Sequence, residues 1–501
     1  MGFESGSKMN RKRLFFVLAG LMLGLGISSC DEKKASAILP MGDTTVIALK
    51  ETTAEFAGKN VNIVQNYYYG TIVEITGSGA YIIQGTLNPG FISVSEKDLD
   101  VTIILNGASI VSKNYAALAS MKKSKVTLEL AENTTNSLSY GSKDSKKQPS
   151  ATLLTQGDLT IRGTGKLIVN SKLNKGIVSR ANLNIEGGEI EVDANKDAIQ
   201  ASNLSISNAA FKIKTGGGSN IPDIAGSSKG LKAASDITIY SGTFDIDSND
   251  DAIHSNGTLT INSGKFAISS GDDAIRAEKR LTINGGEINI TKCYEGLESY
   301  DIDLNGGFVK IKSSDDGINI SGGRRVGNVE ETIDGTLTIT GGEYYVESEG
   351  DAVDSNGSIE MSGGNLVAFG PTSPGSKDRS IDFDRTLNIT GGLLVGLGYT
   401  TDKMKAPESS DTAQSAFLAA IDAVPAGTLI NISSDLGTEV LTIKTIGSIR
   451  SLLISSPLLG KGIFKISSGG SHSGSANALG LYEGGIYTGG SVVKTFSILY
   501  P

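Results

Sequence analysis

Tryptophan is absent from the 501 residues, and histidine and cysteine occur only twice each. Two histidines give little basis for a nucleophilic catalytic triad, and clusters of His and Cys suited to Zn²⁺ are missing. Without Trp, the chain lacks the flat aromatic platform that suits crystalline cellulose. The formal net charge of −9 makes nucleic acid a poor partner.

Proline is scarce as well, and between residues 150 and 370 it occurs only at Pro222. A strand inside a stacked sheet must donate hydrogen bonds to its neighbours, which proline cannot do. What the chain does have is 64 glycines and many short runs that alternate apolar and polar residues. These features predict paired strands joined by tight turns.

A repeat of 21 or 22 residues organises the region from 236 to 323. Its four copies read DITIYSGTFDIDSNDDAIHSN, GTLTINSGKFAISSGDDAIRAEK, RLTINGGEINITKCYEGLESY and DIDLNGGFVKIKSSDDGINISGG. Each copy has an alternating run, a glycine turn, a second alternating run and an acidic turn before Ala or Gly. In the second copy, the alternation predicts that Leu259, Ile261, Phe266 and Ile268 face inward.

Three strands and three turns in about 22 residues leave no room for a helix. One such coil cannot bury its apolar face alone, so coils must stack, at about 4.8 Å per strand. The sequence therefore predicts an all-β fold: a right-handed parallel β-helix, a solenoid of about 22 residues per coil, with a C-terminal β-rich cap. Leucine-rich repeats and the Ca²⁺-binding nonapeptide roll do not fit, because their signature residues are missing.

Residues 1–29 have the features of a bacterial lipoprotein signal peptide. A basic segment precedes an apolar core at residues 14–27, and the sequence Ile27-Ser28-Ser29-Cys30 resembles a lipoprotein box. This resemblance implies lipidation of Cys30, a lipid anchor in the membrane, and a location at the outer membrane or cell surface. An ordinary secretory signal with an incidental cysteine is the alternative.

The rest of the chain divides into a tether and opening strand at residues 30–60, the β-helix at 61–398, and a linker with the cap at 399–501. Within the last part we expect a short helix over residues 413–422 and a flexible loop over residues 467–475 that holds His472. The protein is expected to be a monomer.

Three insertions interrupt the repeat, at residues 215–228, 324–332 and 370–379. The first and the third follow the second strand of their coils, so both are expected to project from one edge. Loops on a rigid scaffold are frequent binding sites.

Acidic residues recur at one turn of the coil. Successive copies hold Asp197, Lys229, Asp251, Asp273, Glu295, Asp316 and Asp351 there, and a neighbouring set adds Asp250, Asp272 and Asp315. Carboxylates stacked about 4.8 Å apart repel by about 3 to 4 kcal/mol per pair at an effective dielectric near 20.

A hard cation would offset this repulsion, and Ca²⁺ accepts six to eight oxygen ligands in irregular geometry. The residues expected to bind Ca²⁺ are Asp250, Asp251, Asp272, Asp273, Glu295, Asp315 and Asp316. The alternative is a solvated acidic edge in which water, raised pKa values and Lys229 or Arg276 ease the repulsion.

Groups suited to an acidic sugar lie near these carboxylates in the repeat. They are Lys229, His254, Arg276, Lys292, Tyr294, Glu298, Tyr300 and Asn319. Arg or Lys can pair with a uronate, Tyr can pack on a ring face, and Ca²⁺ can bridge protein and sugar carboxylates. Each of these residues alone could equally be an ordinary outward-facing side chain.

The run from about 75 to 398 resembles the carbohydrate-binding β-helix family of bacterial cell-surface and secreted proteins, which is similar in fold to family 9 pectate lyases. The similar segments are DVTIILNGASI (100–110), KGIVSRANLNIEGGEIEV (175–192), SKGLKAASDITIYSGTFDI (228–246), NDDAIHSNGTLTINSGKFAI (249–268) and YEGLESYDIDLNGGFVKIKSSDDGINISGG (294–323). In the C-terminal part, AGTLINISSD and LLISSPLLGKG resemble the end cap of that family. The resemblance implies bound Ca²⁺ and binding of acidic polysaccharide such as polygalacturonate.

Three functions remain open from the sequence. Non-catalytic binding of acidic polysaccharide at the cell surface is favoured. A Ca²⁺-dependent pectate-lyase-like enzyme would need Lys229, Arg276 or Lys292 to remove the C5 proton of the sugar. A structural or adhesive surface stalk is the third. The run Gly271 to Ile275 resembles the paired-aspartate motif of polygalacturonases, but the rest of that motif set is missing.

Overall fold

The structure is a computed structural model that describes residues 43–140, 150–221, 226–322, 325–326, 329–402, 404–408 and 413–499. The predicted signal peptide, Cys30 and most of the tether lie outside the described residues. The described residues form strands and turns without any helix. Among them, therefore, no helix could cross a membrane.

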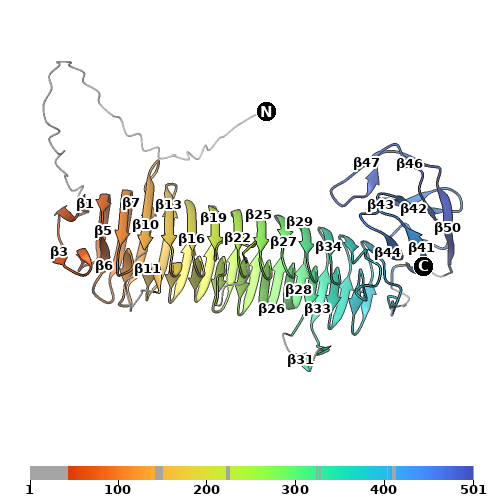
Figure 1. Cartoon of the computed structure of the whole chain (residues 1–501), viewed down its shortest axis with the longest axis horizontal. Coiled ribbons are helices and arrows are strands. Elements are labelled where there is room, and N and C mark those ends of the chain that lie inside the picture. Colours follow the sequence, from red (N-terminus) through yellow and green to blue (C-terminus); the bar gives the residue numbers. More distant parts are fainter. Residues whose placement is uncertain are drawn as a thin grey trace, which may run out of the picture. The chain divides into compact units, whose positions relative to one another are not determined.

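Each coil contributes three strands, and each strand pairs in parallel with its counterpart one coil later. For example, β21 (Ile237–Ile239) pairs with β24 (Thr258–Ile261), β22 (Gly242–Ser248) with β25 (Lys265–Ser270), and β23 (Ile253–Ser255) with β26 (Ile275–Ile283). Figure 1 shows these strands stacked side by side along the chain. The predicted parallel β-helix is confirmed.

The strands therefore form three columns. The first column runs through β5 (Gly79–Leu87), β7 (Asp100–Ser112), β9 (Lys125–Leu130), β12 (Leu159–Gly163), β15 (Asn182–Ile185), β18 (Asn203–Ile206), β21, β24, the end of β26, the end of β28 (Leu297–Leu304), β33 (Thr336–Ile339), β36 (Ser358–Met361) and β39 (Leu387–Ile389). The second runs from the end of β7 through β10 (Thr135–Tyr140), β13 (Lys166–Ser171), β16 (Glu189–Ala194), β19 (Ala209–Thr215), β22, β25, β27 (Glu287–Lys292), β29 (Phe308–Ser313), β34 (Glu343–Ser348), β37 (Asn365–Phe369) and β40 (Leu393–Gly398).

The third column carries the candidate site. It runs through β4 (Gly70–Ile75), β6 (Gly90–Val94), β8 (Leu118–Ser120), β11 (Ala151–Thr155), β14 (Lys175–Ser179), β17 (Ile199–Ala201), β20 (Leu231–Ala233), β23, the start of β26, the start of β28, β30 (Ile318–Ile320), β35 (Val353–Ser355) and β38 (Asp382–Phe383). Residue positions along this column follow one another in unbroken parallel register.

The core follows the predicted alternation. Leu259, Ile261, Phe266 and Ile268 are all buried, while Thr258 is exposed. Like residues stack on like: the rings of Phe211, Phe244 and Phe266 lie 5.0 and 4.4 Å apart and almost parallel. Gly264, at the corner between the first two strands, has a φ of +135°, a conformation that side chains with a Cβ rarely adopt.

The N-terminal coils begin with two antiparallel pairs. β1 (Thr45–Glu51) pairs with β2 (Thr53–Ala57) and also, in parallel, with β5. β3 (Val61–Asn66) pairs with β4. The stretch predicted to hold one opening strand therefore holds two.

The C-terminal part covers the last coil with antiparallel strands. β44 (Ile449–Ser455) pairs with β40 and with β41 (Ala416–Val424). A four-stranded sheet follows, in the order β43 (Glu439–Lys444), β42 (Leu429–Ser434), β45 (Gly462–Ser468) and β50 (Ser491–Ile498). Two short pairs complete it: β46 (Ser471–His472) with β49 (Tyr487–Thr488), and β47 (Ser475–Ala476) with β48 (Tyr482–Glu483).

Two predictions for this part were wrong. The expected helix over residues 413–422 is instead strand β41, because its alternate residues pack against β44 and the cap core. The expected flexible loop at 467–475 contains β46, where the His472 side chain is only 1% exposed and lies 3.4 Å from Glu439. Pairing with a distant segment, which periodicity does not reveal, decides both cases.

The first and third insertions leave the coil at the same point, as predicted. The first follows β19 and the third follows β37, so both connect a second-column strand to the third column. The second insertion follows β30 and contains the hairpin of β31 (Arg325–Val326) and β32 (Val329–Glu330).

Candidate functional site

The predicted acidic residues occupy one position in successive coils, directly before the third-column strands. Backbone hydrogen bonds tie these positions together: Gly230 N donates to Asp251 O at 3.0 Å, Ala252 N to Asp273 O at 3.0 Å, Ala274 N to Glu295 O at 2.9 Å and Gly296 N to Asp316 O at 3.1 Å. We call this set the inner row. In full it comprises Lys175, Asp197, Lys229, Asp251, Asp273, Glu295, Asp316, Asp351 and Arg379.

Two further rows flank the inner row. The residue before each inner-row position gives the outer row, which includes Lys196, Ser228, Asp250, Asp272, Tyr294 and Asp315. The residue three positions after gives the strand row, which by parallel register is Gln200, Lys232, His254, Arg276, Glu298, Asn319, Asp354 and Asp382. The sequence repeat places all three rows on one face.

Four carboxylates of the inner row are buried and the rest of the row is half-buried, which the alternative of a solvated acidic edge did not anticipate. Asp251 is 1% exposed, Asp273 3% and Glu295 8%. In the outer row, Asp272 is exposed, while Asp250 is half-buried. The second part of that alternative, relief of the repulsion by Lys229 and Arg276, agrees with the ion pairs that these two residues make.

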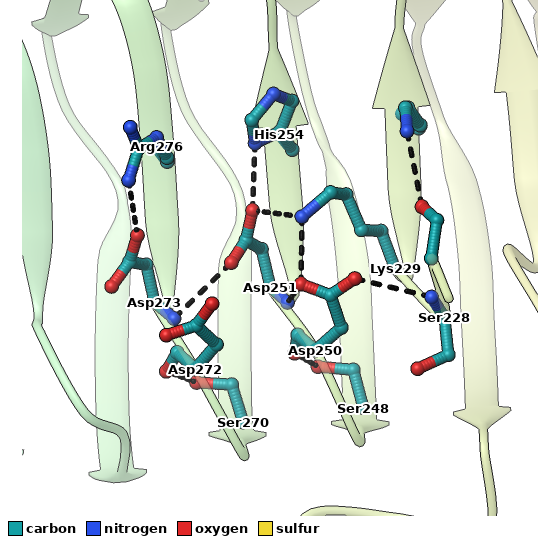
Figure 2. Close-up of polar contacts among 12 residues, drawn as sticks. Ser228, Lys229, Ser248, Asp250, Asp251, His254, Ser270, Asp272, Asp273 and Arg276 are labelled. Carbon is teal, nitrogen blue, oxygen red and sulfur yellow. Dashed lines mark hydrogen bonds and ion pairs between the residues drawn. The ribbon is translucent and has the colours of Figure 1, made fainter. Parts of the chain in front are cut away.

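Lys229 neutralises the first group of carboxylates. Its Nζ lies 2.7 Å from Oδ1 of Asp250 and 2.5 Å from Oδ2 of Asp251, and His254 Nδ1 lies 2.6 Å from the same Asp251 oxygen (Figure 2). Burial favours the neutral form of Asp251, but the His254 hydrogen bond and the Lys229 charge outweigh it and hold the pKa at about 2. Asp272 completes the group. Its side chain is exposed on one side, but partial desolvation by the protein atoms around it, followed by repulsion from Asp273, raises its pKa to about 7.

The second group has less compensation. Oxygen atoms of Asp273, Glu295 and Glu298 lie within 4.8 Å of one another, and all three side chains are buried. Arg276 contacts Asp273 at 3.1 Å and also Glu298, but no base of the described chain contacts Glu295. Burial and the neighbouring carboxylates raise the pKa of Asp273 to about 8 and that of Glu295 to about 10.

Asn319 is the partner of Glu295. Its Nδ2 donates to Glu295 Oε2 at 3.0 Å, while its buried Oδ1 has no hydrogen-bond partner. One neutral amide cannot offset the charge of Glu295, which explains why the pKa of Glu295 stays high. The buried, unpaired oxygen of Asn319 is also the kind of ligand that a hard cation accepts.

A third group, formed by Asp351, Asp354 and Asp382, was not predicted from the sequence as a cation site. Their oxygen atoms also lie within 4.8 Å of one another, and Arg379 contacts Asp382 and donates its backbone N–H to Asp351. Burial raises the pKa of Asp351 to about 7. Asp316, between the second and third groups, has a pKa raised to about 9 by burial and by Asp354 and Asp351.

The remaining predicted site residues are dispersed. Lys292 lies at the end of the second-column strand β27, where its Nζ donates to Ser219 O at 2.5 Å and to Asn220 Oδ1 at 3.0 Å in the first insertion. Tyr294 is in the outer row and 44% exposed, and a hydrogen bond with Asp315 raises its pKa. Tyr300 lies at the far end of the third-column part of β28 and is half-buried.

The first insertion is bound to residues that directly precede the first group of carboxylates. Ser219 N donates to Asp247 Oδ1 at 2.7 Å, and Asn249 Nδ2 donates to Ile221 O at 2.7 Å. Between Gly226 of the insertion and the outer-row pair Asp250 and Asp272 lies an open cavity of about 360 Å³. This cavity gives a ligand access to the carboxylates.

The donor sets fit Ca²⁺. All ligand atoms are carboxylate oxygens. Within each group they lie no more than 4.8 Å from one another, which is about twice a Ca–O distance of about 2.4 Å. In each group three ionised carboxylates and one base, namely Lys229, Arg276 or Arg379, leave a charge of −2. A divalent cation matches that charge.

Part of the chain is similar to proteins described as carbohydrate-binding. A family model described as "Carbohydrate-binding domain-containing protein" matches residues 69–218 and 195–274. A protein of the same description from Acetivibrio thermocellus is 30% identical over 197 residues, which is 37% of this chain and 66% of that protein. The chain thus spans slightly less than two thirds of that relative.

A solved structure is also similar: a polysaccharide lyase-like protein from C. thermocellum, studied as a gadolinium derivative. It shares 20% identity with a TM-score of 0.32, covering 69% of this chain and 96% of that chain. Both matched segments of the family model include third-column strands, and the second reaches Asp250, Asp251, Asp272 and Asp273. Part of the candidate site therefore lies within the region that matches a carbohydrate-binding family.

Proposed function

We propose that this protein is a non-catalytic, lipid-anchored surface protein that binds acidic polysaccharide, such as polygalacturonate, through Ca²⁺ ions. The observation that carries the proposal is the buried group of Asp273, Glu295 and Glu298, with only one base in contact. These carboxylates cannot all be ionised near neutral pH without a counter-charge. A bound Ca²⁺ would supply it.

The outer row makes such ions useful for recognition. Ca²⁺ accepts more ligands than three carboxylates supply, so it can also coordinate a uronate of the polysaccharide. Asp250 and Asp272 line the cavity beside Gly226 of the first insertion, and Tyr294, which is 44% exposed, follows them in the outer row. A sugar carboxylate in that cavity would lie next to the ions.

The geometry supports binding more than lyase chemistry. A lyase needs a base that is neutral when it takes the C5 proton of the sugar. Burial disfavours the charge on Lys229, but Asp251 and Asp250 outweigh burial and raise its pKa. The pKa of Arg276 is likewise raised by Glu298 and Asp273 against the effect of burial. Lys292 is occupied by the first insertion.

The surface location rests on the sequence at residues 27–30 alone. Lipidation of Cys30 would place the first described residue about a dozen residues from the membrane anchor. Labelling of cells with a radioactive fatty acid tests this part of the proposal: a Cys30→Ala variant should lose the label, whereas Cys293→Ala should keep it.

A sedimentation assay with insoluble polygalacturonate tests the binding. The chain should sediment with the polymer in Ca²⁺ and stay in solution in chelator. Glu295→Gln should weaken sedimentation, whereas Glu287→Gln, an exposed carboxylate on β27, should not. Equal sedimentation in Ca²⁺ and in chelator would contradict the proposal. Ultraviolet absorbance from an unsaturated product would show a lyase, and absence of polysaccharide binding would leave a structural stalk.

A further inference from the structure

The outer row continues toward the N-terminus into an aromatic cluster. In the third column Leu118, Leu153, Ile177 and Ile199 share one register position, which Ile253 and Leu297 occupy in later coils. Tyr115 is three residues before Leu118, as Asp250 is before Ile253 and Tyr294 before Leu297. Tyr115 is therefore an outer-row residue.

Four aromatic rings meet around Tyr115. The Tyr69 ring lies 6.0 Å from Tyr115 and 5.9 Å from Phe91, and the Phe91 and Tyr115 rings lie 4.5 Å apart. Tyr68 packs edge-on against Tyr69 at 4.8 Å. Tyr68 and Tyr69 come from the turn between β3 and β4, and Tyr115 precedes β8. Figure 1 shows β3 at the N-terminal end of the stack.

The turn that carries Tyr68 presents rings to the solvent at the edge of this cluster. Tyr68, whose ring belongs to the cluster, is 48% exposed, and Tyr67, which precedes it in the turn, is fully exposed. Tyr69 and Tyr115 are half-buried, and Phe91 is buried. The rings are steeply inclined to one another, so they form a faceted surface and not a flat platform. Such a surface suits a single sugar chain, whose C–H faces pack on aromatic rings, better than the flat face of a crystal.

A second observation points to a polar ligand at the same place. Asn114 is 6% exposed, and its Nδ2 donates to Tyr68 O at 2.7 Å, but its Oδ1 has no hydrogen-bond partner. A buried acceptor without a partner is costly, and a hydroxyl group is a donor that would satisfy it. Asn114 is joined to the tyrosine turn itself, so an aromatic surface and an unpaired acceptor lie together.

We propose that this tyrosine cluster is a second carbohydrate subsite, which holds a distal part of the same polysaccharide chain. Sugar rings pack on Tyr67 and Tyr68, and a sugar hydroxyl donates to Asn114. The inference rests on the proposed function, because it takes the acidic rows as the primary site. It also gives the course of the bound polysaccharide, which runs along the outer row.

The spacing of the coils sets the length of chain required. Five coil-to-coil steps separate Tyr115 from Asp250, which is about 24 Å at about 4.8 Å per step. A galacturonate trimer is too short to reach from the tyrosines to the first carboxylate group, whereas a dodecamer can. Simultaneous contact at both subsites strengthens binding by raising the effective concentration of the second.

Calorimetric titration of the full chain with both oligomers, in Ca²⁺, tests the inference. We expect the dodecamer to bind at least about tenfold more tightly than the trimer. A double variant, Tyr67→Ala with Tyr68→Ala, should reduce this advantage to the part that the acidic rows supply, without changing trimer affinity or the melting shift caused by Ca²⁺. Tyr68→Phe should keep most of it, and Tyr240→Ala, at an exposed tyrosine outside the cluster, should keep all of it.

The outcomes separate the two proposals. Equal affinity for the two oligomers, or an unchanged advantage in the double variant, would overturn the tyrosine subsite and leave the Ca²⁺ site standing. Loss of trimer binding in the double variant would also overturn it, because the trimer would then bind at the tyrosines. If the unaltered chain binds neither oligomer in Ca²⁺, the proposed function itself fails.

Discussion

The ammonium of Lys229 lies 2.5 Å from the carboxylate of Asp251, which belongs to the next coil. Asp251 is buried and the Lys229 side chain is 13% exposed, so the pair holds two coils together where water screens the charges poorly. Asp273, Glu295 and Asp316 have weaker compensation, and their pKa values are raised.

Lys229→Met is therefore expected to destabilise the protein. Removal of one partner of a buried ion pair costs about 3–5 kcal/mol, because the other charge remains buried. Urea unfolding in chelator measures the loss. Lys265→Met removes an exposed pair with Glu287 and should cost less than about 1 kcal/mol. Equal effects of the two variants would contradict the role given to Lys229.

Without Ca²⁺, stability should fall as pH rises, and Ca²⁺ should suppress this fall. The pKa values of Asp272, Asp273, Glu295, Asp316 and Asp351 are raised to about 7, 8, 10, 9 and 7, against ordinary values near 4. Unfolded carboxyls lose their protons first as pH rises, so stability from these groups is complete below pH 4 and is lost toward pH 10.

Thermal melts at several pH values check this dependence. In chelator, the melting temperature should fall between pH 5 and pH 9. In excess Ca²⁺ it should not fall, because the ion binds the ionised form. Asp251 acts in the opposite sense: its pKa of about 2 gives stability above pH 4 that disappears as pH drops toward 2.

Glu295→Gln should separate metal binding from folding. Burial and neighbouring carboxylates raise the pKa of Glu295 to about 10, so in the metal-free protein at pH 7 the side chain is already neutral. The glutamine side chain should therefore leave the melting temperature in chelator unchanged or slightly higher. Calcium affinity should fall at least about tenfold, because a carboxylate ligand is lost. An unchanged affinity by calorimetry would remove Glu295 from the cation site.

Lys292→Ala should loosen the first insertion. Lys292 donates to Ser219 and Asn220, and these contacts tie the insertion to a strand three coils further along the stack. Limited proteolysis should cut the variant faster within residues 215–228, with little change in melting temperature. Lys212→Ala, an exposed lysine on β19, is the matched control. Equal rates of cutting would show that other contacts hold the insertion.

Stacking was predictable because it follows from the repeat itself. A period of 22 residues with a glycine turn fixes which residues lie above one another, so the positions of Asp251, Asp273, Glu295 and Asp316 came directly from the sequence. Burial was not predictable, because it depends on the side chains that surround each carboxylate, such as Lys229, His254 and Arg276.

The sequence contains a motif that indicates the third carboxylate group, but the group was not predicted from it. Residues 351–354 read DAVD, the counterpart of DAIH at 251–254 and DAIR at 273–276. Insertions on both sides break the regular spacing around this copy, so Asp354 and Asp382 were not aligned with the strand row. The helix predicted over 413–422 failed for another reason: pairing of β41 with β44 overrides local preference.

The inner row begins with Lys175 and ends with Arg379. Lys175 contacts Asp197 at 2.9 Å, and Arg379 contacts both Asp351 and Asp382. A positive residue thus terminates the line of negative charge at either end. The carboxylates of the inner row therefore all lie in the coils between these two residues, and their number is fixed by that interval and not by the length of the solenoid. Lengthening the stack outside Lys175 or Arg379 would add scaffold without adding carboxylates to that interval.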